Sequence, residues 1–254
     1  MDFSLWLPYL IACPLCALAG FIDSIAGGGG LISLPAYYLV KFPARLAAGT
    51  NKVSSSLGAI TAVIKYARNG SILWVPALLS TLGALPGAYF GARALMAIDE
   101  RLAIRAMLFV LPAVALIVLF RRGKVQRDVK LGWVKYPIFM LIGLVVGFYD
   151  GMVGPGSGTF LIMLFCGITG MEPLMASGTA KVTNLASGLS SLVGYMLSGY
   201  ANFPLGIAAG IFSMGGNLLG AGLAIKKGAK IIQAVLMIVL GLIFITLIIE
   251  HFAA

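Results

Sequence analysis

Residues 20–35 read GFIDSIAGGGGLISLP, and they place a carboxylate and four consecutive glycines inside an apolar stretch that runs from about Phe3 to Val40. Each glycine weakens a helix by about 1 kcal/mol relative to alanine. A carboxylate at the centre of a membrane helix costs roughly 3 kcal/mol on insertion scales. A helix that only had to cross lipid would carry neither feature. We therefore expect the helix to break at the glycines and Asp23 to have a role of its own.

The composition predicts an all-α integral membrane protein. The 254 residues are 60% hydrophobic and 10% charged, whereas soluble proteins average about 25% charged residues. Uncharged runs at 182–225 and 231–249 reach the roughly 20 residues that a helix needs to cross a bilayer. Surfaces that bind single-stranded nucleic acid interleave basic and aromatic residues. This sequence shows no such interleaving. We expect the lipid bilayer as a partner and no nucleic acid.

Most of the positive charge lies in three short patches. The net charge is +10, and eleven of the 18 Lys and Arg fall within residues 65–68, 121–135 and 226–230. Basic residues near membrane spans favour the cytoplasmic side. The three patches are therefore predicted to share the cytoplasmic face, which fixes how often the chain crosses the membrane between them.

The chain repeats itself. The motif GFIDSIAGGG at 20–29 returns as GFYDGMVGPG at 147–156, and AAGTNKV at 47–53 returns as ASGTAKV at 176–182. Two motifs in the same order at one spacing indicate duplication. We predict a first membrane repeat over 1–121, a basic cytoplasmic linker over 122–133 and a second membrane repeat over 134–254.

Each half is predicted to be a broken helical hairpin, re-entrant or fully crossing, followed by three transmembrane helices. The hairpins are 3–42 and 136–170, broken at the glycine tracts. An odd number of single spans gives the halves opposite orientations, with both termini periplasmic. Inverted repeats of this kind hold their substrate where the breaks meet. Further single spans are expected near 72–96 and 103–120 in the first half and near 174–198, 203–225 and 231–249 in the second.

Charged residues inside the apolar segments come as two matched pairs, Asp23 with Asp150 and Lys52 with Lys181. Ionisable residues within membrane spans indicate function. We expect the lysines, the hairpin N–H groups and neighbouring hydroxyls and amides to bind a small anion. The aspartates are expected to carry a coupling proton, because burial favours the neutral form of a carboxyl group. The predicted substrate-binding set is Lys52, Lys181, Thr50, Thr179, Gly28, Gly29, Gly156, Ser157, Asn51 and Asn184.

Structural roles for the same four charges stay open. Asp23 and Asp150 are placed to cap the helices that follow the breaks. Lys52 and Lys181 are equally able to form ion pairs with those aspartates, or to extend toward the membrane surface. Capping and proton coupling are compatible with each other.

Other glycines are predicted to serve helix packing. Gly83, Gly87 and Gly91 recur every four residues, and so do Gly216 and Gly220. Small residues at this spacing let two membrane helices approach closely.

The duplicated stretches GFIDSIAGGGG and GFYDGMVGPGSG, with AAGTNKVSSSLGAI and ASGTAKVTNLASGL, resemble those of the TauE/SafE family of membrane transporters, also called the sulfite exporter family. The resemblance covers nearly the whole chain. It implies proton-driven transport of sulfite, sulfoacetate or another organosulfonate across a bacterial inner membrane. Asn51 stands opposite Ala180, so the two copies of the site differ there.

Two other functions remain as alternatives. A passive anion channel would share the lysines and broken hairpins but would not need the aspartates. An intramembrane hydrolase would need a base for a serine, and Ser157 with Lys181 is the pair available. Catalysis has no need of two copies of a site, so we expect no enzyme, no cofactor and no metal. The sequence leaves a homo-oligomer open.

Overall fold

The computed structural model describes residues 3–98, 136–239 and 241, and every regular element within them is a helix. The predicted linker and the predicted span at 103–120 lie outside the described residues, as do residues 240 and 242–249 of the span predicted near 231–249. The described residues thus confirm the all-helical class.

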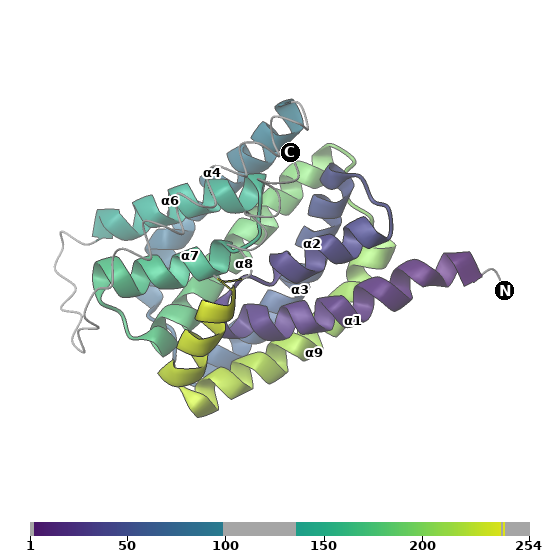
Figure 1. Cartoon of the computed structure of the whole chain (residues 1–254). Helices are drawn as coiled ribbons and strands as arrows, with labels where there is room; N and C mark the ends of the chain where they lie inside the picture. The colour runs from purple at the N-terminus through teal and green to yellow at the C-terminus, as the bar shows by residue number, and fades with distance from the viewer. Residues whose placement is uncertain (1–2, 99–135, 240, 242–254) are drawn as a thin grey trace.

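The first hairpin breaks where the glycines predict. Helix α1 (Phe3–Ala26) ends before Gly27, and α2 (Gly30–Leu39) begins three residues later and runs back beside α1 (Figure 1). Gly27 and Gly28 have φ of 74° and 83°. Residues with a Cβ avoid this left-handed region, so glycine allows the chain to reverse within three residues.

The second hairpin repeats this arrangement. Helix α6 (Tyr136–Met152) is followed by α7 (Ser157–Leu164), which continues into a turn of π-helix, η2 (Phe165–Thr169). Gly154 and Gly156 have φ of 95° and 81°. The break predicted within VGPGSG is therefore confirmed.

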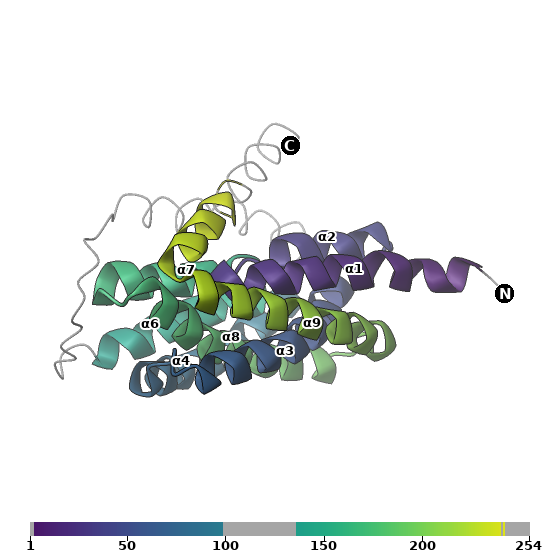
Figure 2. The same ribbon diagram turned by 90° about the horizontal axis from the view of Figure 1, so that it is seen from below.

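The two hairpins approach from opposite ends of the molecule, and their tips meet in its interior (Figures 1 and 2). The Thr159 hydroxyl donates a hydrogen bond to the Ala26 carbonyl at 2.9 Å. A Cβ on Gly27 would overlap the backbone of Gly158 and Thr159. The tips are thus in direct backbone contact, which explains why small residues are needed there.

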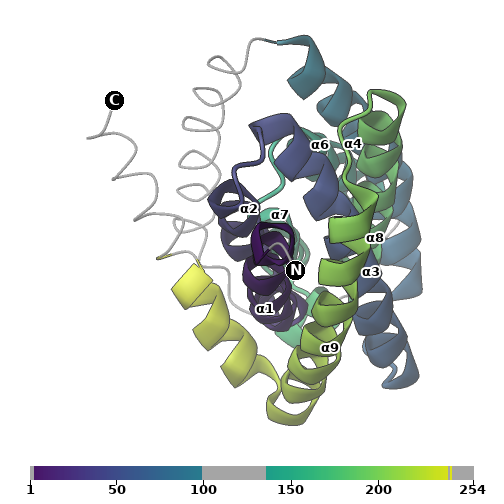
Figure 3. The same ribbon diagram turned by 90° about the vertical axis from the view of Figure 1, so that its right-hand side faces the viewer.

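Four long helices surround the tips: α3 (Ala44–Arg68), α4 (Trp74–Ala97), α8 (Pro173–Leu197) and α9 (Phe203–Lys227). Helix α4 packs along α6 and α8, α9 packs along α1 and α3, and α3 also contacts α8. Seen from the side of the N-terminus, α3, α8 and α9 lie beside α1 and α7 (Figure 3). A shorter apolar helix over residues 229–239 follows α9.

The predicted glycine packing is confirmed. A Cβ on Gly83, Gly87 or Gly91 would overlap a backbone carbonyl of α6, and one on Gly216 or Gly220 would overlap a carbonyl of α1. These glycines let α4 and α9 lie against the hairpins without intervening side chains.

Apolar surface and polar interior indicate a membrane-embedded protein. Trp6–Ala26, Trp74–Ala97 and Phe203–Lys227 are long and apolar enough to cross a bilayer. Large side chains such as Leu82 on α4 and Leu219 on α9 are exposed. Helices α3 and α8 instead bury most of their serines and threonines, together with their mid-helix lysines. Polar groups at membrane depth are tolerated when protein or water surrounds them.

Candidate ion-pair site between the hairpin tips

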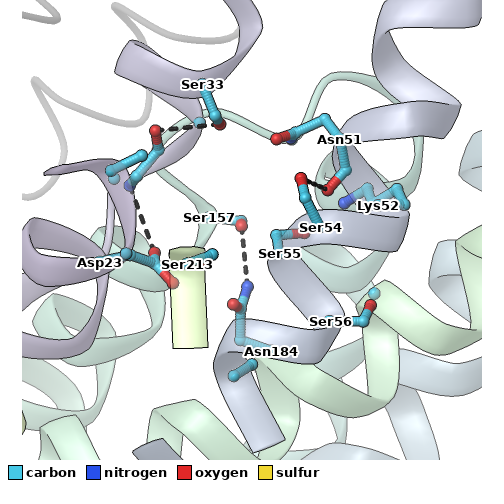
Figure 4. A pocket seen from close by; sticks show the side chains of 18 of the residues that line it. Asp23, Ser33, Asn51, Lys52, Ser54, Ser55, Ser56, Ser157, Asn184 and Ser213 are labelled. Carbon is cyan, nitrogen blue, oxygen red and sulfur yellow. Dashed lines mark hydrogen bonds between the residues drawn. The ribbon is translucent and has the colours of Figure 1, made fainter. Parts of the chain in front are cut away.

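A small polar cavity of about 40 Å³ lies where the hairpin tips meet α3 and α8 (Figure 4). Its charged lining residues are Asp23, Lys52 and Asp150. Figure 4 shows Asp23 and Lys52 on opposite sides of it. Its polar neutral side chains are Ser33, Ser54, Ser55, Ser56, Ser157, Ser213, Asn51 and Asn184.

Two ion pairs border the cavity, and each joins a lysine of one half to an aspartate of the other. Lys52 Nζ lies 2.8 Å from Asp150 Oδ2, and Lys181 Nζ lies 2.5 Å from Asp23 Oδ2. All four residues are at least largely buried, with side-chain exposures between 2% and 16%. The lysines therefore form ion pairs with the aspartates, which is one of the structural roles that the sequence left open. The site as a whole carries no net charge.

Asp23 also meets the start of the second hairpin helix. Its Oδ1 accepts the Gly29 N–H at 3.2 Å, so it supports the N-terminus of α2 as the capping interpretation expects. A Cβ on Gly29 would lie 2.6 Å from the Cβ of Asp23. Glycine at this position therefore brings the backbone N–H within reach of the carboxylate.

Asp150 is held by side chains instead. The Ser157 hydroxyl donates to its Oδ1 at 2.6 Å, and the Ser187 hydroxyl donates to its Oδ2 at 2.7 Å. Asn184 Nδ2 in turn donates to Ser157 Oγ at 3.1 Å. Ser187 is not among the site residues predicted from the sequence. Its signal is the spacing of Lys181, Asn184 and Ser187 at three-residue steps, which keeps them near one face of α8.

The structure brings most of the predicted binding set together. Three predicted residues lie outside the cavity lining: Lys181, Thr50 and Thr179. Lys181 is 2% exposed and paired with Asp23. The threonine hydroxyls accept backbone N–H groups just before α9 and α4, from Asn202 at 3.0 Å and Leu73 at 3.1 Å. The predicted residues that do line the cavity are Lys52, Gly28, Gly29, Gly156, Ser157, Asn51 and Asn184.

Two atoms of the cavity lining are buried without a hydrogen-bond partner in the described part of the chain: Asn51 Oδ1 and Ser56 Oγ. Buried polar atoms normally have partners, so each such atom needs an explanation. Both belong to α3 side chains that are about 95% buried, at 5% and 4% exposure. A small polar ligand or water in the cavity would supply the missing bonds.

The serine–lysine dyad is not assembled. Ser157 donates to Asp150 and accepts from Asn184, while Lys181 is bound to Asp23. The hydroxyl therefore has a carboxylate as its acceptor rather than the amine that the hydrolase alternative requires.

Comparison with known proteins identifies the family. The model described as Sulfite exporter TauE/SafE matches residues 12–247. The chain belongs to this family. ORF9 of Sinorhizobium sp, named "Probable membrane transporter protein", is 32% identical over 222 residues, covering 87% of this chain and 85% of that protein. No solved structure gives a significant match.

Two further relatives of this TauE/SafE chain carry the same kind of name. A "Probable membrane transporter protein" of Haemophilus influenzae is 30% identical, over 90% of this chain and 91% of that protein. "Probable membrane transporter protein YfcA" of Escherichia coli K12 is 29% identical, over 87% and 82%. The relatives are thus named as transporters, and membership of this family makes the chain a membrane transporter.

Proposed function

We propose that the protein is a proton-coupled secondary transporter that moves a small sulfur-containing anion across the bacterial inner membrane by alternating access. The proposal rests on two buried lysine–aspartate ion pairs beside a polar cavity. Each ion pair joins a residue of one half of the chain to a residue of the other. The three basic patches face the cytoplasm and both termini face the periplasm, in keeping with the distribution of Lys and Arg.

Recurring contacts support inverted repeats as the basis of this mechanism. The Tyr66 hydroxyl donates to the Ser24 carbonyl at 2.7 Å, and the matched Tyr195 hydroxyl donates to the Gly151 carbonyl at 2.9 Å. The hairpins enter from opposite ends (Figure 2). Repeats that rock against each other around a central site expose that site to the two sides in turn.

The ion pairs supply a reason for proton coupling. An anion that binds a lysine must take the place of an aspartate, because two negative charges would otherwise share one ammonium group. Two like charges 4 Å apart repel by about 4 kcal/mol at an effective dielectric of 20. A proton on the aspartate removes this repulsion. The anion and the proton therefore enter the site together, which predicts symport.

The cavity favours a compact oxyanion. Hydroxyl and amide donors surround it, and charge-assisted hydrogen bonds from lysine suit carboxylate-like or sulfonate-like oxygens. Its volume of about 40 Å³ limits the part of the ligand that enters it to a few atoms. Sulfite, thiosulfate and sulfoacetate fit these requirements, and the family description names sulfite.

Ligand-induced stabilisation of the purified protein tests the proposal. We expect sulfite, thiosulfate or sulfoacetate to raise Tm. A ligand at 100 times its Kd stabilises the folded state by about 2.7 kcal/mol. Lys52→Ala and Lys181→Ala should lose the response, whereas Lys65→Ala, at an exposed position on α3, should keep it.

Two results would contradict the proposal. One is that no anion of the panel stabilises the wild type; the other is that both buried-lysine variants respond like the wild type. Uptake into proteoliposomes then separates a transporter from a channel. Accumulation driven by an inward proton gradient supports the transporter, and flux that follows the anion gradient alone, regardless of pH, supports the channel.

A further inference from the structure

We propose that the two ion pairs have different roles: Asp23 takes up the transported proton and releases Lys181 to the anion, whereas Asp150 stays charged and holds Lys52 in position. This inference rests on the proposed function. It identifies the ion pair in which the anion takes the place of the aspartate during transport.

The hydrogen bonds of the two carboxylates carry the inference. Asp150 accepts from three side-chain donors, Lys52 at 2.8 Å, Ser157 at 2.6 Å and Ser187 at 2.7 Å. Asp23 accepts from Lys181 and, at 3.2 Å, from one backbone N–H. Hydrogen bonds to the charged form of a carboxyl group stabilise that form. The charged form of Asp150 is therefore held by more hydrogen bonds than the charged form of Asp23.

The difference originates in two positions of the repeat. Ser157 stands where the first half has Gly30, and Ser187 stands where it has Gly58. A Cβ on Gly58 would lie 2.3 Å from the Ser213 hydroxyl oxygen and 2.5 Å from the Asn217 amide nitrogen, both on α9. The first half thus has neither the hydroxyls nor the room for one at Gly58.

Access to the cavity also differs. The Asp23 side chain is 16% exposed, and that of Asp150 is 5% exposed. Lys181, at 2% exposure, is absent from the cavity lining, whereas its partner Asp23 is part of it. Asp23 thus stands between the cavity and Lys181. A proton that enters the cavity finds the more exposed and less hydrogen-bonded carboxylate first.

The charged groups around Asp23 allow this exchange. Lys181 on α8 is its direct partner, and Lys52 on α3 and Asp150 on α6 border the same cavity. Tyr66 on α3 lies close enough to interact electrostatically with Asp23. Helices α2 and α7 contain no Asp, Glu, Lys, Arg or His, and the charges of α9 are confined to its last turn.

The exchange leaves the site neutral when the anion carries a single negative charge. A proton from the aqueous side forms an O–H bond on the Asp23 carboxylate, the ion pair with Lys181 breaks, and the anion pairs with the Lys181 ammonium. Release on the other side reverses these steps, with the proton leaving Asp23 as the pair re-forms. The Lys52–Asp150 pair stays intact throughout, and Lys52 adds its positive charge to the cavity.

Comparing Asp23→Asn with Asp150→Asn tests the assignment, with thiosulfate as the probe because its own charge does not change between pH 5.5 and 8.5. Binding is followed over this range, and proteoliposomes report thiosulfate exchange and proton-driven accumulation. In Asp23→Asn we expect binding that no longer depends on pH, exchange that persists, and accumulation that is lost. In Asp150→Asn we expect weaker binding that keeps the pH dependence of the wild type.

Ser187→Ala keeps the test decisive if an aspartate variant fails to fold. Losing a hydroxyl would shift the pH midpoint of thiosulfate binding upward if Asp150 were the titrating group. We expect an unchanged midpoint; a shifted midpoint, or pH independence in Asp150→Asn with pH dependence kept in Asp23→Asn, overturns the assignment. A wild type that binds no sulfur anion, or transports one without protons, refutes the proposed function instead.

Discussion

The two hairpin tips occupy matched positions but are built differently. The first tip is four glycines, residues 27–30, whereas the second reads GPGS over residues 154–157. Pro155 has a fixed φ, and its carbonyl accepts the Tyr149 hydroxyl at 2.5 Å. Ser157 ties the second tip to Asp150. Glycine loses more conformational freedom on folding than any other residue, so the first tip is the easier one to rearrange.

This difference parallels that between the ion pairs. Asp150, beside the more rigid second tip, accepts hydrogen bonds from three side chains. Asp23, beside the glycine tip, accepts only two hydrogen bonds, one from Lys181 and one from a backbone N–H. A transporter that alternates between two states needs one part that stays in place and another part that rearranges. The recurring motif supplies both, because its second copy has Pro155 and Ser157 where the first copy has Gly28 and Gly30.

The largest expected effect comes from deleting each lysine separately. Breaking a buried ion pair by removing one partner costs about 3–5 kcal/mol, so both Lys52→Ala and Lys181→Ala should lower Tm strongly at pH 8. Under the proposed assignment Asp23 is the carboxylate that takes up a proton, and a neutral Asp23 needs no partner once Lys181 is gone. The loss in Lys181→Ala should therefore shrink as pH falls, while the loss in Lys52→Ala should persist.

Thermal unfolding in detergent between pH 5.5 and 8.5 measures this pair of variants. Equal pH dependence of the two Tm losses would remove the proposed distinction between the ion pairs, and a loss that shrinks only in Lys52→Ala would reverse it.

A smaller effect is expected from the hairpin tip. Gly27→Ala places a Cβ in the left-handed region and onto the backbone of Gly158. The left-handed conformation costs about 1–2 kcal/mol, and overpacking adds roughly 1–3 kcal/mol. Gly70→Ala is the matched control, because Gly70 has φ of 69° with nothing within 4 Å of its Cβ position.

Chemical denaturation of both variants gives the comparison. Gly27→Ala should lose more stability than Gly70→Ala by the overpacking contribution. Equal losses would show that contact between the tips contributes nothing beyond backbone conformation.

The smallest expected effect on stability is at Asn51, whose counterpart in the repeat is already Ala180. Asn51 Oδ1 has no hydrogen-bond partner in the described part of the chain, so Asn51→Ala removes no bond made by that atom and should change stability by about 0.5 kcal/mol or less. Sulfite affinity should fall several-fold if the amide faces the ligand. Isothermal titration, with Asn69→Ala outside the cavity as control, decides this; unchanged affinity would place the ligand elsewhere in the cavity.

Local features were predictable from the sequence because they depend on neighbouring residues. The helix breaks follow from left-handed glycines at 27, 28, 154 and 156. The close packing of α4 and α9 follows from small residues at four-residue spacing. The cavity residues Ser33, Ser56 and Ser213 were not predicted, since a serine in an apolar helix gives no sign of which face it lies on.

The sequence by itself determined that the chain is a membrane-embedded helical protein with a recurring motif, two broken hairpins and four charges inside apolar segments, because composition, motif spacing and charge placement are properties of the chain alone. Which aspartate meets which lysine was decided only by the tertiary structure. Pairing within a half and pairing across the halves satisfy the repeat equally well. The hairpins enter from opposite ends, and their meeting tips place each aspartate beside the lysine of the other half.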